Sequence, residues 1–385
     1  MPLKSGFWFD NDCAIIVSVS HIWKQRDNSP IMTAAFTRHE RTVVELKSER
    51  NARKTVSRAP TLEDVARAAG LSPMTVSRAL NTPHIVRPAT VAKVMEAVKV
   101  TGYIPNLLAG SLASRRSKLI AVVVPQINNN MFVDTVQSLS DELAVRGYHM
   151  LLCVAGYSHE SETDIVSTLL SRRPDGIVLT GIHHNTELKK AIINTGLPVV
   201  EIWDLTPTPI DMLVGFSHEK IGNAIGEYLV NKGHRRFGFI WTDDKRAMLR
   251  KKGVLDVLNR QGECQWQDAL VPLPATMALG RSGLDALLAT GQTFDAIICS
   301  SDTLAQGAIF EAQTHQLCVP QDLAVMGFGD LDFAACNIPA ITTVNIDRWK
   351  IGKDAATLLA DKIEGVPVEE GIVDIGFTLM ERESA

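Results

Sequence analysis

Residues 61–81 combine two helix signals with side chains suited to reading DNA bases. Thr61 and Ser72 are typical helix caps, and Pro73 fits the first turn of a second helix, where its missing N–H costs nothing. Gly70 separates the two predicted helices. The outward face of the second helix is polar and largely uncharged, and it carries Met74, Thr75, Ser77, Arg78 and Asn81. Such a face suits contact with base edges in a major groove.

The alternative for this segment is an ordinary helical hairpin. A third predicted helix at 89–101, ending at Gly102, favours a three-helix DNA-binding headpiece instead. The charge distribution agrees: the whole chain carries a net charge of −4, but residues 1–58 carry +4, residues 59–118 carry +5 and residues 119–385 carry −13. A basic head on an acidic body is typical of a nucleic-acid-binding protein.

The composition describes a globular protein with more than one domain. A chain of 385 residues is too long for one compact core, and its 45% hydrophobic and 21% charged residues are ordinary for a soluble fold. The six cysteines are scattered without a C-x-x-C pair, which favours free thiols in a reducing compartment. No run of 18 apolar residues and no convincing signal peptide is present, so the sequence predicts a cytoplasmic protein with no membrane contact.

Residues 1–58 mix aromatic, polar and basic residues without sustained periodicity. They are expected to form a poorly ordered N-terminal extension. A basic arm that assists DNA binding is one alternative, and an initiation codon assigned too early, with Met32 as the true start, is another.

From residue 119 onward the pattern alternates between apolar strands and amphipathic helices. The predicted strands lie at 119–124, 149–154, 176–179, 198–202, 236–241, 296–299 and 323–327. One of the predicted helices between them lies at 252–261. Strands that are apolar throughout and alternate with helices indicate parallel sheets covered on both faces. Ligands of such sheets bind outside the carboxyl ends of the strands.

The residues that follow these strands are rich in amides, hydroxyls, carboxylates and aromatic rings. They include Gln126, Asn130, Phe132, Thr180, His183, Trp203, Asp204, the segment 242–250, Asp302 and Phe328. This composition suits a small polyhydroxylated ligand, with an arginine available for a carboxylate. A single polar residue at such a place is more simply a helix cap, so only the convergence of several strand ends on one cleft supports a binding site.

Catalytic and metal sites have no comparable support in the sequence. His183 and His184 are adjacent, so their side chains point different ways, and no third ligand is suitably spaced. No phosphate-binding loop, dinucleotide fingerprint or nucleophile elbow is present. We therefore expect no enzyme activity, no metal and no cofactor.

Four segments together resemble the LacI-type transcriptional regulators. These are Thr61–Asn81, Gly-Tyr-Ile-Pro-Asn at 102–106, Asp-Gly-Ile-Val at 175–178 and Val-Met-Gly-Phe at 325–328. The resemblance covers residues 60–385. Within the family, the segments at 173–176, 198–201 and 214–216 resemble gluconate-operon repressors.

The resemblance implies roles for several N-terminal residues. Pro73, Met74 and Arg78 would occupy base-reading positions. Residues 106–117 would form a hinge helix and linker, with Leu112 as an apolar wedge in the minor groove and Ala109 at the close contact of two such helices. The full set of expected DNA-binding residues is Thr61, Leu62, Ser72, Pro73, Met74, Thr75, Ser77, Arg78, Asn81, Ala109 and Leu112.

The resemblance also implies an effector site in the body. Arg250 and Asp302 would match effector-binding residues of the family, and Phe132 its stacking aromatic. The expected order is a headpiece at 59–105, the hinge at 106–117 and an effector-binding and dimerisation domain at 118–385. That domain would resemble periplasmic binding proteins, with one α/β subdomain at about 118–216 and 345–372 and the other at about 217–344 and 373–385.

These observations predict a repressor that binds near-palindromic operator DNA as a homodimer under control of a carbohydrate-like acid such as gluconate. The chain ends without a heptad tail, so no tetramerising helix is expected. A periplasmic-type sugar-binding protein is one alternative, although it would have no use for residues 61–81. A regulator of the same fold that senses a nucleobase or an amino acid is the other.

Overall fold

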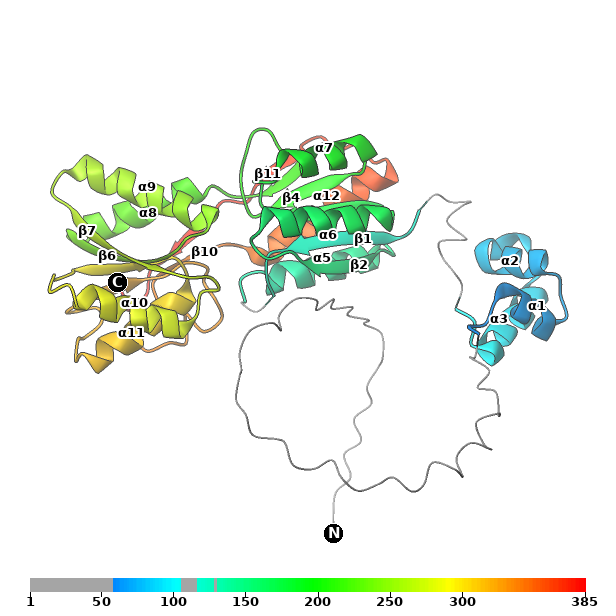
Figure 1. Ribbon diagram of the computed structural model, residues 1–385, viewed down its shortest axis with the longest axis horizontal. Helices are drawn as coiled ribbons and strands as arrows, with labels where there is room; N and C mark the ends of the chain where they lie inside the picture. Colours follow the sequence, from blue (N-terminus) through cyan, green and yellow to red (C-terminus); the bar gives the residue numbers. More distant parts are fainter. Residues whose placement is uncertain (1–57, 105–115, 128–129) are drawn as a thin grey trace, which may run out of the picture. The chain divides into compact units, whose positions relative to one another are not determined.

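The structure, a computed structural model, describes residues 58–104, 116–127 and 130–385. Almost all of the predicted N-terminal extension, at 1–57, therefore lies outside the described residues. Among the residues that are described, no helix is long and apolar enough to cross a membrane. The chain divides into two compact units, which are considered separately below (Figure 1).

The small unit contains the predicted headpiece helices. They are α1 (Leu62–Ala69), α2 (Pro73–Asn81), a short 3-10 turn η1 (Pro83–Ile85) and α3 (Pro88–Thr101). The N–H of Thr61 donates to the Asp64 carboxylate at 2.9 Å, and Ser72 Oγ accepts from the N–H of Thr75 at 3.2 Å. Gly70 ends α1 in the left-handed conformation, with φ of 59°, which glycine adopts at little cost. The core consists of Val65, Ala66, Ala69, Val76, Ala79, Val94 and Ala97.

The large unit contains a six-stranded parallel sheet, which with its helices is called the first lobe. Its strands are β1 (Leu119–Val124), β2 (His149–Val154), β3 (Gly176–Thr180), β4 (Val199–Ile202), β5 (Met212–Gly215) and β11 (Ile372–Asp374), in the order β11-β5-β4-β3-β1-β2. One face packs against α5 (Val133–Val145) and α12 (Arg348–Glu364), and the other against α6 (His159–Ser171) and α7 (Thr186–Thr195).

The second lobe is built around a four-stranded parallel sheet in the order β7-β6-β8-β9 (Figure 1). Its strands are β6 (Arg236–Thr242), β7 (Gln265–Val271), β8 (Ala296–Cys299) and β9 (Ala324–Met326). Helices α8 (His218–Asn231) and α9 (Lys245–Gln261) cover one face, and α10 (Met277–Leu288) and α11 (Asp302–Thr314) cover the other. The antiparallel pair β10 (Thr343–Asn345) and β12 (Thr378–Met380) continues from β9 through isolated bridges.

The predicted α/β architecture of two parallel sheets is confirmed. All seven predicted strands are present, and the chain crosses between the lobes after β5, before α12 and after β11. Two boundaries differ from expectation. Because β11 extends the first sheet to Asp374, the last crossing lies two residues beyond the expected boundary at 372. Helix α9 begins at Lys245 rather than at 252, so Arg246 and Arg250 both lie on it.

Candidate DNA-binding and effector-binding sites

The outward face of α2 carries the predicted base-reading side chains. Met74 is 62% exposed, and Pro73, Arg78 and Asn81 are also exposed. Within residues 58–104, the Arg78 guanidinium has no hydrogen-bond or ion-pair partner. A cation held on a rigid helix without an internal partner is available to a base edge or a phosphate.

For the other residues that were predicted to contact DNA, the structure shows only their contacts within the headpiece, and their contact with DNA stays a prediction. Thr61 and Ser72 cap α1 and α2, and Leu62 packs at the edge of the headpiece core. Thr75 and Ser77 are half-buried on α2. The predicted hinge residues, Ala109 and Leu112, lie outside the described residues.

A cavity of about 240 Å³ lies at the carboxyl ends of strands from both lobes. The first lobe contributes Pro125, Gly156, Tyr157, Ser158, His159, Glu162, Thr180, Gly181, His183, His184 and Asp204. The second lobe contributes Asp243, Asp244, Lys245, Arg246 and Leu273. Its volume is below the roughly 300–1,000 Å³ of drug-sized ligand sites, so it suits a smaller polar molecule.

The structure brings only part of the predicted effector-binding set to this cavity. Thr180, His183 and Asp204 line it. Gln126 is buried and Asn130 is exposed, and neither lines the cavity. The remaining predicted residues also do not line it: they are Phe132, Trp203, Arg250, Asp302 and Phe328.

An aromatic series lies behind the cavity wall. The ring centroids of Phe132 and Trp203 are 5.0 Å apart, those of Trp203 and Phe216 are 5.7 Å apart, and those of Phe216 and His218 are 4.8 Å apart. These edge-to-face contacts join the buried core of the first lobe to the start of α8. Phe132 is therefore packed against Trp203 in the described conformation.

Arg250 is 5% exposed and is engaged with protein groups. Its Nη1 lies 3.0 Å from His218 Nδ1, its Nη2 donates to the Ser300 carbonyl at 3.0 Å, and its guanidinium stacks 3.8 Å above the Phe328 ring. Burial and the nearby Arg250 charge hold the pKa of His218 well below its usual value. The neutral ring therefore accepts from Arg250 at Nδ1 and donates from Nε2 to the Trp203 carbonyl at 2.9 Å.

Asp302 is fully buried at the start of α11. Its carboxylate accepts from the N–H of Leu331 at 2.8 Å and from the Thr343 hydroxyl at 2.6 Å. Burial raises the pKa of Asp302 to about 6 in spite of these bonds. In this conformation Asp302 fastens β10 and the segment after β9 to α11, and direct contact of Asp302 or Arg250 with an effector stays a prediction.

Several buried polar atoms around the cavity have no hydrogen-bond partner among the described residues. They are Trp203 Nε1, Asp204 Oδ2, Arg246 Nη1 and Arg250 Nε. Asp204 Oδ2 and Arg246 Nη1 are 3.9 Å apart, which is too far for a hydrogen bond. Burial raises the pKa of Asp204 to about 6, although Arg246 and Arg250 oppose this shift. Unsatisfied buried groups cost free energy, so their concentration here indicates a site that a ligand completes.

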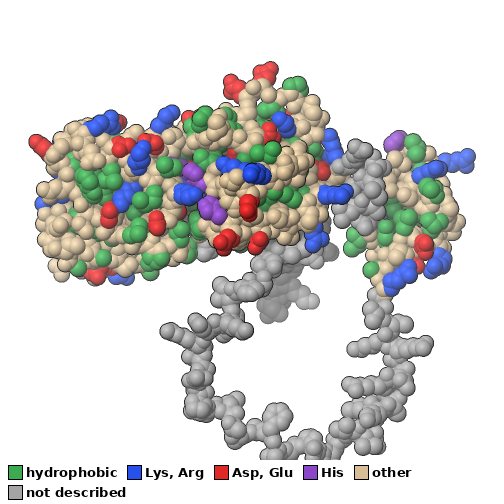
Figure 2. All heavy atoms as spheres, turned by 45° about the horizontal axis from the view of Figure 1, so that its top comes forward, with side chains coloured by type: hydrophobic (Ala, Val, Ile, Leu, Met, Phe, Trp, Pro, Cys, Tyr) green, Lys and Arg blue, Asp and Glu red, His purple; other side chains and the backbone are tan. Residues whose placement is uncertain are grey.

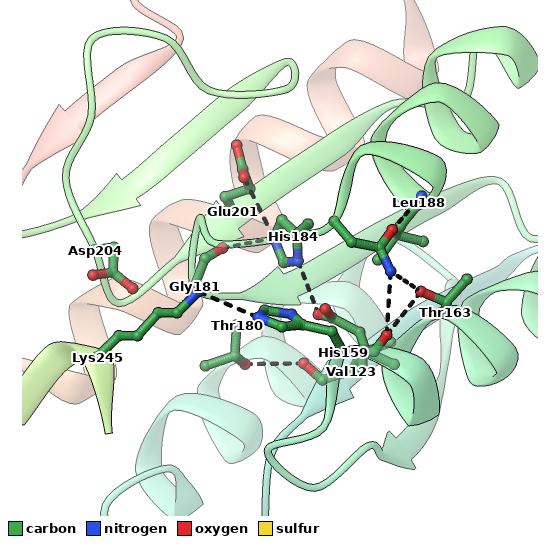
Figure 3. A network of polar contacts seen from close by, with 12 residues as sticks. Val123, His159, Thr163, Thr180, Gly181, His184, Leu188, Glu201, Asp204 and Lys245 are labelled. Atoms are coloured by element: carbon green, nitrogen blue, oxygen red, sulfur yellow. Dashed lines mark hydrogen bonds and ion pairs between the residues drawn. The ribbon is translucent and has the colours of Figure 1, made fainter. Parts of the chain in front are cut away.

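A buried ion network forms one wall of the cavity (Figure 3). His184 Nδ1 lies 2.9 Å from Glu162 Oε1, and His184 Nε2 lies 2.9 Å from the Gly181 carbonyl and 3.4 Å from Glu201 Oε1. Burial lowers the pKa of His184, but the two glutamates outweigh it and raise the pKa to about 9. A protonated His184 donates from both ring nitrogens, so neither is available to a metal.

Basic side chains reach the cavity from both lobes. Lys245 Nζ on α9 lies 3.2 Å from His159 Nε2 at the start of α6 (Figure 3). The His183 side chain is largely exposed, but the burial of part of it lowers its pKa, and the positive charges of Lys245 and Arg246 lower that pKa further. In Figure 2, histidine side chains gather with Lys and Arg side chains near the middle of the large unit. The lining as a whole carries charges of both signs, with Lys245, Arg246 and the protonated His184 beside the carboxylates of Glu162, Asp204, Asp243 and Asp244.

One group outside the cavity has the composition of a metal site. Asp285, Glu311 and His315 place their ligand atoms within 4.8 Å of one another on α10 and α11. Arg281 Nε donates to Glu311 at 2.7 Å, and His315 Nε2 lies 3.3 Å from Asp285. Glu311 of this group therefore already pairs with Arg281, and none of the three residues lines the cavity.

The cavity residues Tyr157, His159 and Glu162 were not predicted from the sequence, and His184 was considered there only as a metal ligand, which was rejected. The rule that locates ligands after strands would have found the first two, because they closely follow the predicted strand at 149–154. It did place Lys245 and Arg246 within the segment 242–250. No local signal could show that His184 lies between two glutamates that are distant in sequence.

Comparisons with known proteins agree with this geometry. Residues 61–106 match the model of "Bacterial regulatory proteins, lacI family", and residues 227–385 match that of a periplasmic binding protein-like domain. The chain is 36% identical over 341 residues to the HTH-type transcriptional regulator GntR of Pseudomonas aeruginosa, covering 88% of this chain and 98% of that protein.

Two solved structures extend the comparison. A LacI family transcriptional regulator from Silicibacter pomeroyi superposes with a TM-score of 0.80 at 30% identity, covering 84% of this chain and 99% of the other. The lac repressor dimer bound to operator and the anti-inducer ONPF gives a TM-score of 0.72 at 25% identity, covering 85% and 99%. The chain therefore belongs to the LacI family, as a transcriptional repressor with a DNA-binding helix-turn-helix headpiece and an effector domain.

Proposed function

We propose that this repressor responds to a small sugar acid of the gluconate type, which binds in the cavity at the strand ends of the two lobes. The observation that carries the proposal is the pair of buried, unpartnered polar atoms there, the acceptor Asp204 Oδ2 and the donor Arg246 Nη1. A polyhydroxylated acid supplies both the anion and the hydroxyl groups that such atoms need. The GntR name of the P. aeruginosa relative points to the same class.

On the DNA side, we propose that Pro73, Met74 and Arg78 of α2 face the major groove of an operator half-site. The headpiece is small, so two copies in a homodimer would read a near-palindromic site. The predicted hinge residues Ala109 and Leu112 would act in the minor groove between the half-sites. Such a protein acts on DNA in the cytoplasm, and we assign it no enzyme activity.

A ligand screen tests the effector class. The full-length protein is heated with sodium D-gluconate, related aldonates, neutral sugars, nucleobases and amino acids, each at a saturating concentration. A true effector at 100 times its dissociation constant adds ~2.7 kcal/mol to the free energy of unfolding and raises the melting temperature. Stabilisation by a nucleobase or an amino acid, and not by aldonates, would contradict the proposal.

The DNA-binding half is tested on the same preparation. Selection from a pool of random duplexes should recover a site with two-fold symmetry, and fluorescence anisotropy should show weaker binding to one isolated half-site. Titration of the selected DNA complex with the stabilising ligand then measures the coupling between the two sites. Equal affinity for the half-site and the full site would contradict the dimer.

A further inference from the structure

We propose that Arg246 and Asp204 together recognise a 2-hydroxycarboxylate, the group at one end of an aldonic acid. Arg246 would hold the carboxylate, and Asp204 would accept a hydrogen bond from the adjacent hydroxyl. The inference rests on the proposed effector class and adds the residue pair that selects it.

The two side chains are neighbours in the lining of the cavity, and their interaction is incomplete. Asp204 follows β4 of the first lobe, and Arg246 lies in the first turn of α9 in the second lobe. The 3.9 Å between Asp204 Oδ2 and Arg246 Nη1 exceeds hydrogen-bond distance, and both atoms are buried without another hydrogen-bond partner among the described residues. A 2-hydroxy acid presents a carboxylate acceptor beside a hydroxyl donor. The carboxylate can accept from Arg246, and the hydroxyl can donate to Asp204.

Neighbouring groups hold both members of the pair in place. The Arg246 guanidinium lies 5.7 Å from the centre of the Phe132 ring, within reach of a cation–π contact. Asp204 follows Trp203, which has a φ of 73°, and His218 fixes this turn by donating to the Trp203 carbonyl. A bulky residue in the left-handed region is strained, and such strain concentrates at ligand sites.

Arg250 is one helical turn further along α9 and differs from Arg246 in its partners. Both Nη atoms of Arg250 already contact His218 and Ser300, and the residue does not line the cavity. Arg246 lines the cavity, and its side chain makes no hydrogen bond to any described residue. Of these two arginines, Arg246 is therefore the one whose guanidinium is available to donate two parallel hydrogen bonds to a carboxylate.

The pair also predicts which acids are rejected. A 2-deoxyaldonate carries a hydrogen where the aldonate carries the hydroxyl, so it would leave Asp204 without a donor. Burial raises the pKa of Asp204 to about 6, so this group is still mainly an ionised acceptor at neutral pH. A site built to accept a hydrogen bond discriminates strongly against a ligand that lacks the donor.

The test is isothermal titration of the full-length protein with sodium D-gluconate and with 2-deoxy-D-gluconate. Arg246→Gln should weaken gluconate binding roughly ten- to a hundredfold, because each hydrogen bond to a charged group is worth ~1.5–3 kcal/mol. Arg246→Lys should recover part of the loss. Asp204→Asn should lower the ratio of gluconate to 2-deoxygluconate affinity at least about threefold, because a neutral amide oxygen accepts a weaker hydrogen bond from the hydroxyl than a carboxylate does.

Lys245→Gln is the matched control, because it removes the same charge from the adjacent residue of the same cavity. Melting of each variant without ligand shows whether it is folded. Equal weakening by Arg246→Gln and Lys245→Gln, or an unchanged affinity ratio in Asp204→Asn, overturns the pair assignment while leaving the effector class intact. Absence of binding of any aldonate to wild-type protein that still binds its selected DNA overturns the effector class, and the pair assignment with it.

Discussion

Replacing His184 with Asn should remove a pH-dependent part of the stability of the large unit. His184 is buried between Glu162 on α6 and Glu201 on β4, so it ties a helix to the sheet that it covers. Its pKa is raised to about 9, because the two glutamates outweigh the effect of burial. The folded protein therefore holds a proton that an unfolded chain releases near pH 6.5.

The sign and size of the effect follow from this difference. A group with a raised pKa contributes its full stability below its unfolded pKa and loses it as the pH rises through the folded pKa. A shift from 6.5 to about 9 corresponds to about 3 kcal/mol at 1.36 kcal/mol per pKa unit. The wild-type protein should lose this amount between pH 6.5 and 9, and His184→Asn should not.

Urea unfolding at several pH values, followed by tryptophan fluorescence, measures the effect. Trp203 and Trp241 are buried in the large unit and report on its unfolding. The difference in unfolding free energy between wild type and His184→Asn cancels the titration of shared groups that are remote from the network. A difference that stays constant from pH 6 to pH 9 would refute the reasoning and show that His184 is neutral in the folded protein.

Three further predictions concern binding and packing. Arg78→Ala should cost ~1–3 kcal/mol on the selected operator and less on random duplexes, measured by fluorescence anisotropy, and equal losses would place Arg78 on phosphate instead. Leu112→Ala should weaken operator binding and spare gluconate binding, and the reverse result would contradict the hinge assignment. Arg250→Met should lower the melting temperature because His218 Nδ1 and the Ser300 carbonyl lose their donor, at ~1–3 kcal/mol for each unsatisfied group, and an unchanged melting temperature would contradict this packing role.

The sequence identified the headpiece because its signals are local. The Ser72 cap, the left-handed Gly70 and the apolar spacing of Val65 and Val76 all act within one turn of the residues that carry them. The seven strands that were predicted from the body share the same advantage, because each is a short, continuous apolar run. Tertiary contacts reinforce local patterns of this kind, so the elements that they predict are present in the folded protein.

Five strands in the described part of the chain were not predicted, and four of them lack such a pattern. The fifth, β5 (Met212–Gly215), is buried throughout but is only four residues long. β7 (Gln265–Val271) lies at the edge of its sheet and is polar at three of its first four positions, and β10, β11 and β12 are only three residues long. Helix α9 was predicted to start late because its first two turns are rich in Lys and Arg and carry a weak apolar stripe. The cap that starts it is Asp244, which accepts from the N–H of Ala247 at 2.9 Å.

The position of the candidate site could be predicted from the sequence better than the residues that line it. The rule for parallel sheets located the strand ends, and Thr180, His183 and Asp204 line the cavity as expected. Which cation points into the cavity depends on partners far away in the sequence. Arg250 contacts His218 and Ser300, which leaves Arg246 facing Asp204, and no spacing within α9 records this difference.

The position of that pair bears on how an effector could control the repressor. A ligand shifts a conformational equilibrium only by its difference in affinity for the two states. Asp204 belongs to the first lobe and Arg246 to the second, so a ligand that contacts both gains its full binding energy only when the lobes hold them about this far apart. We therefore expect Arg246→Gln to abolish the effect of the ligand on the balance between the lobes.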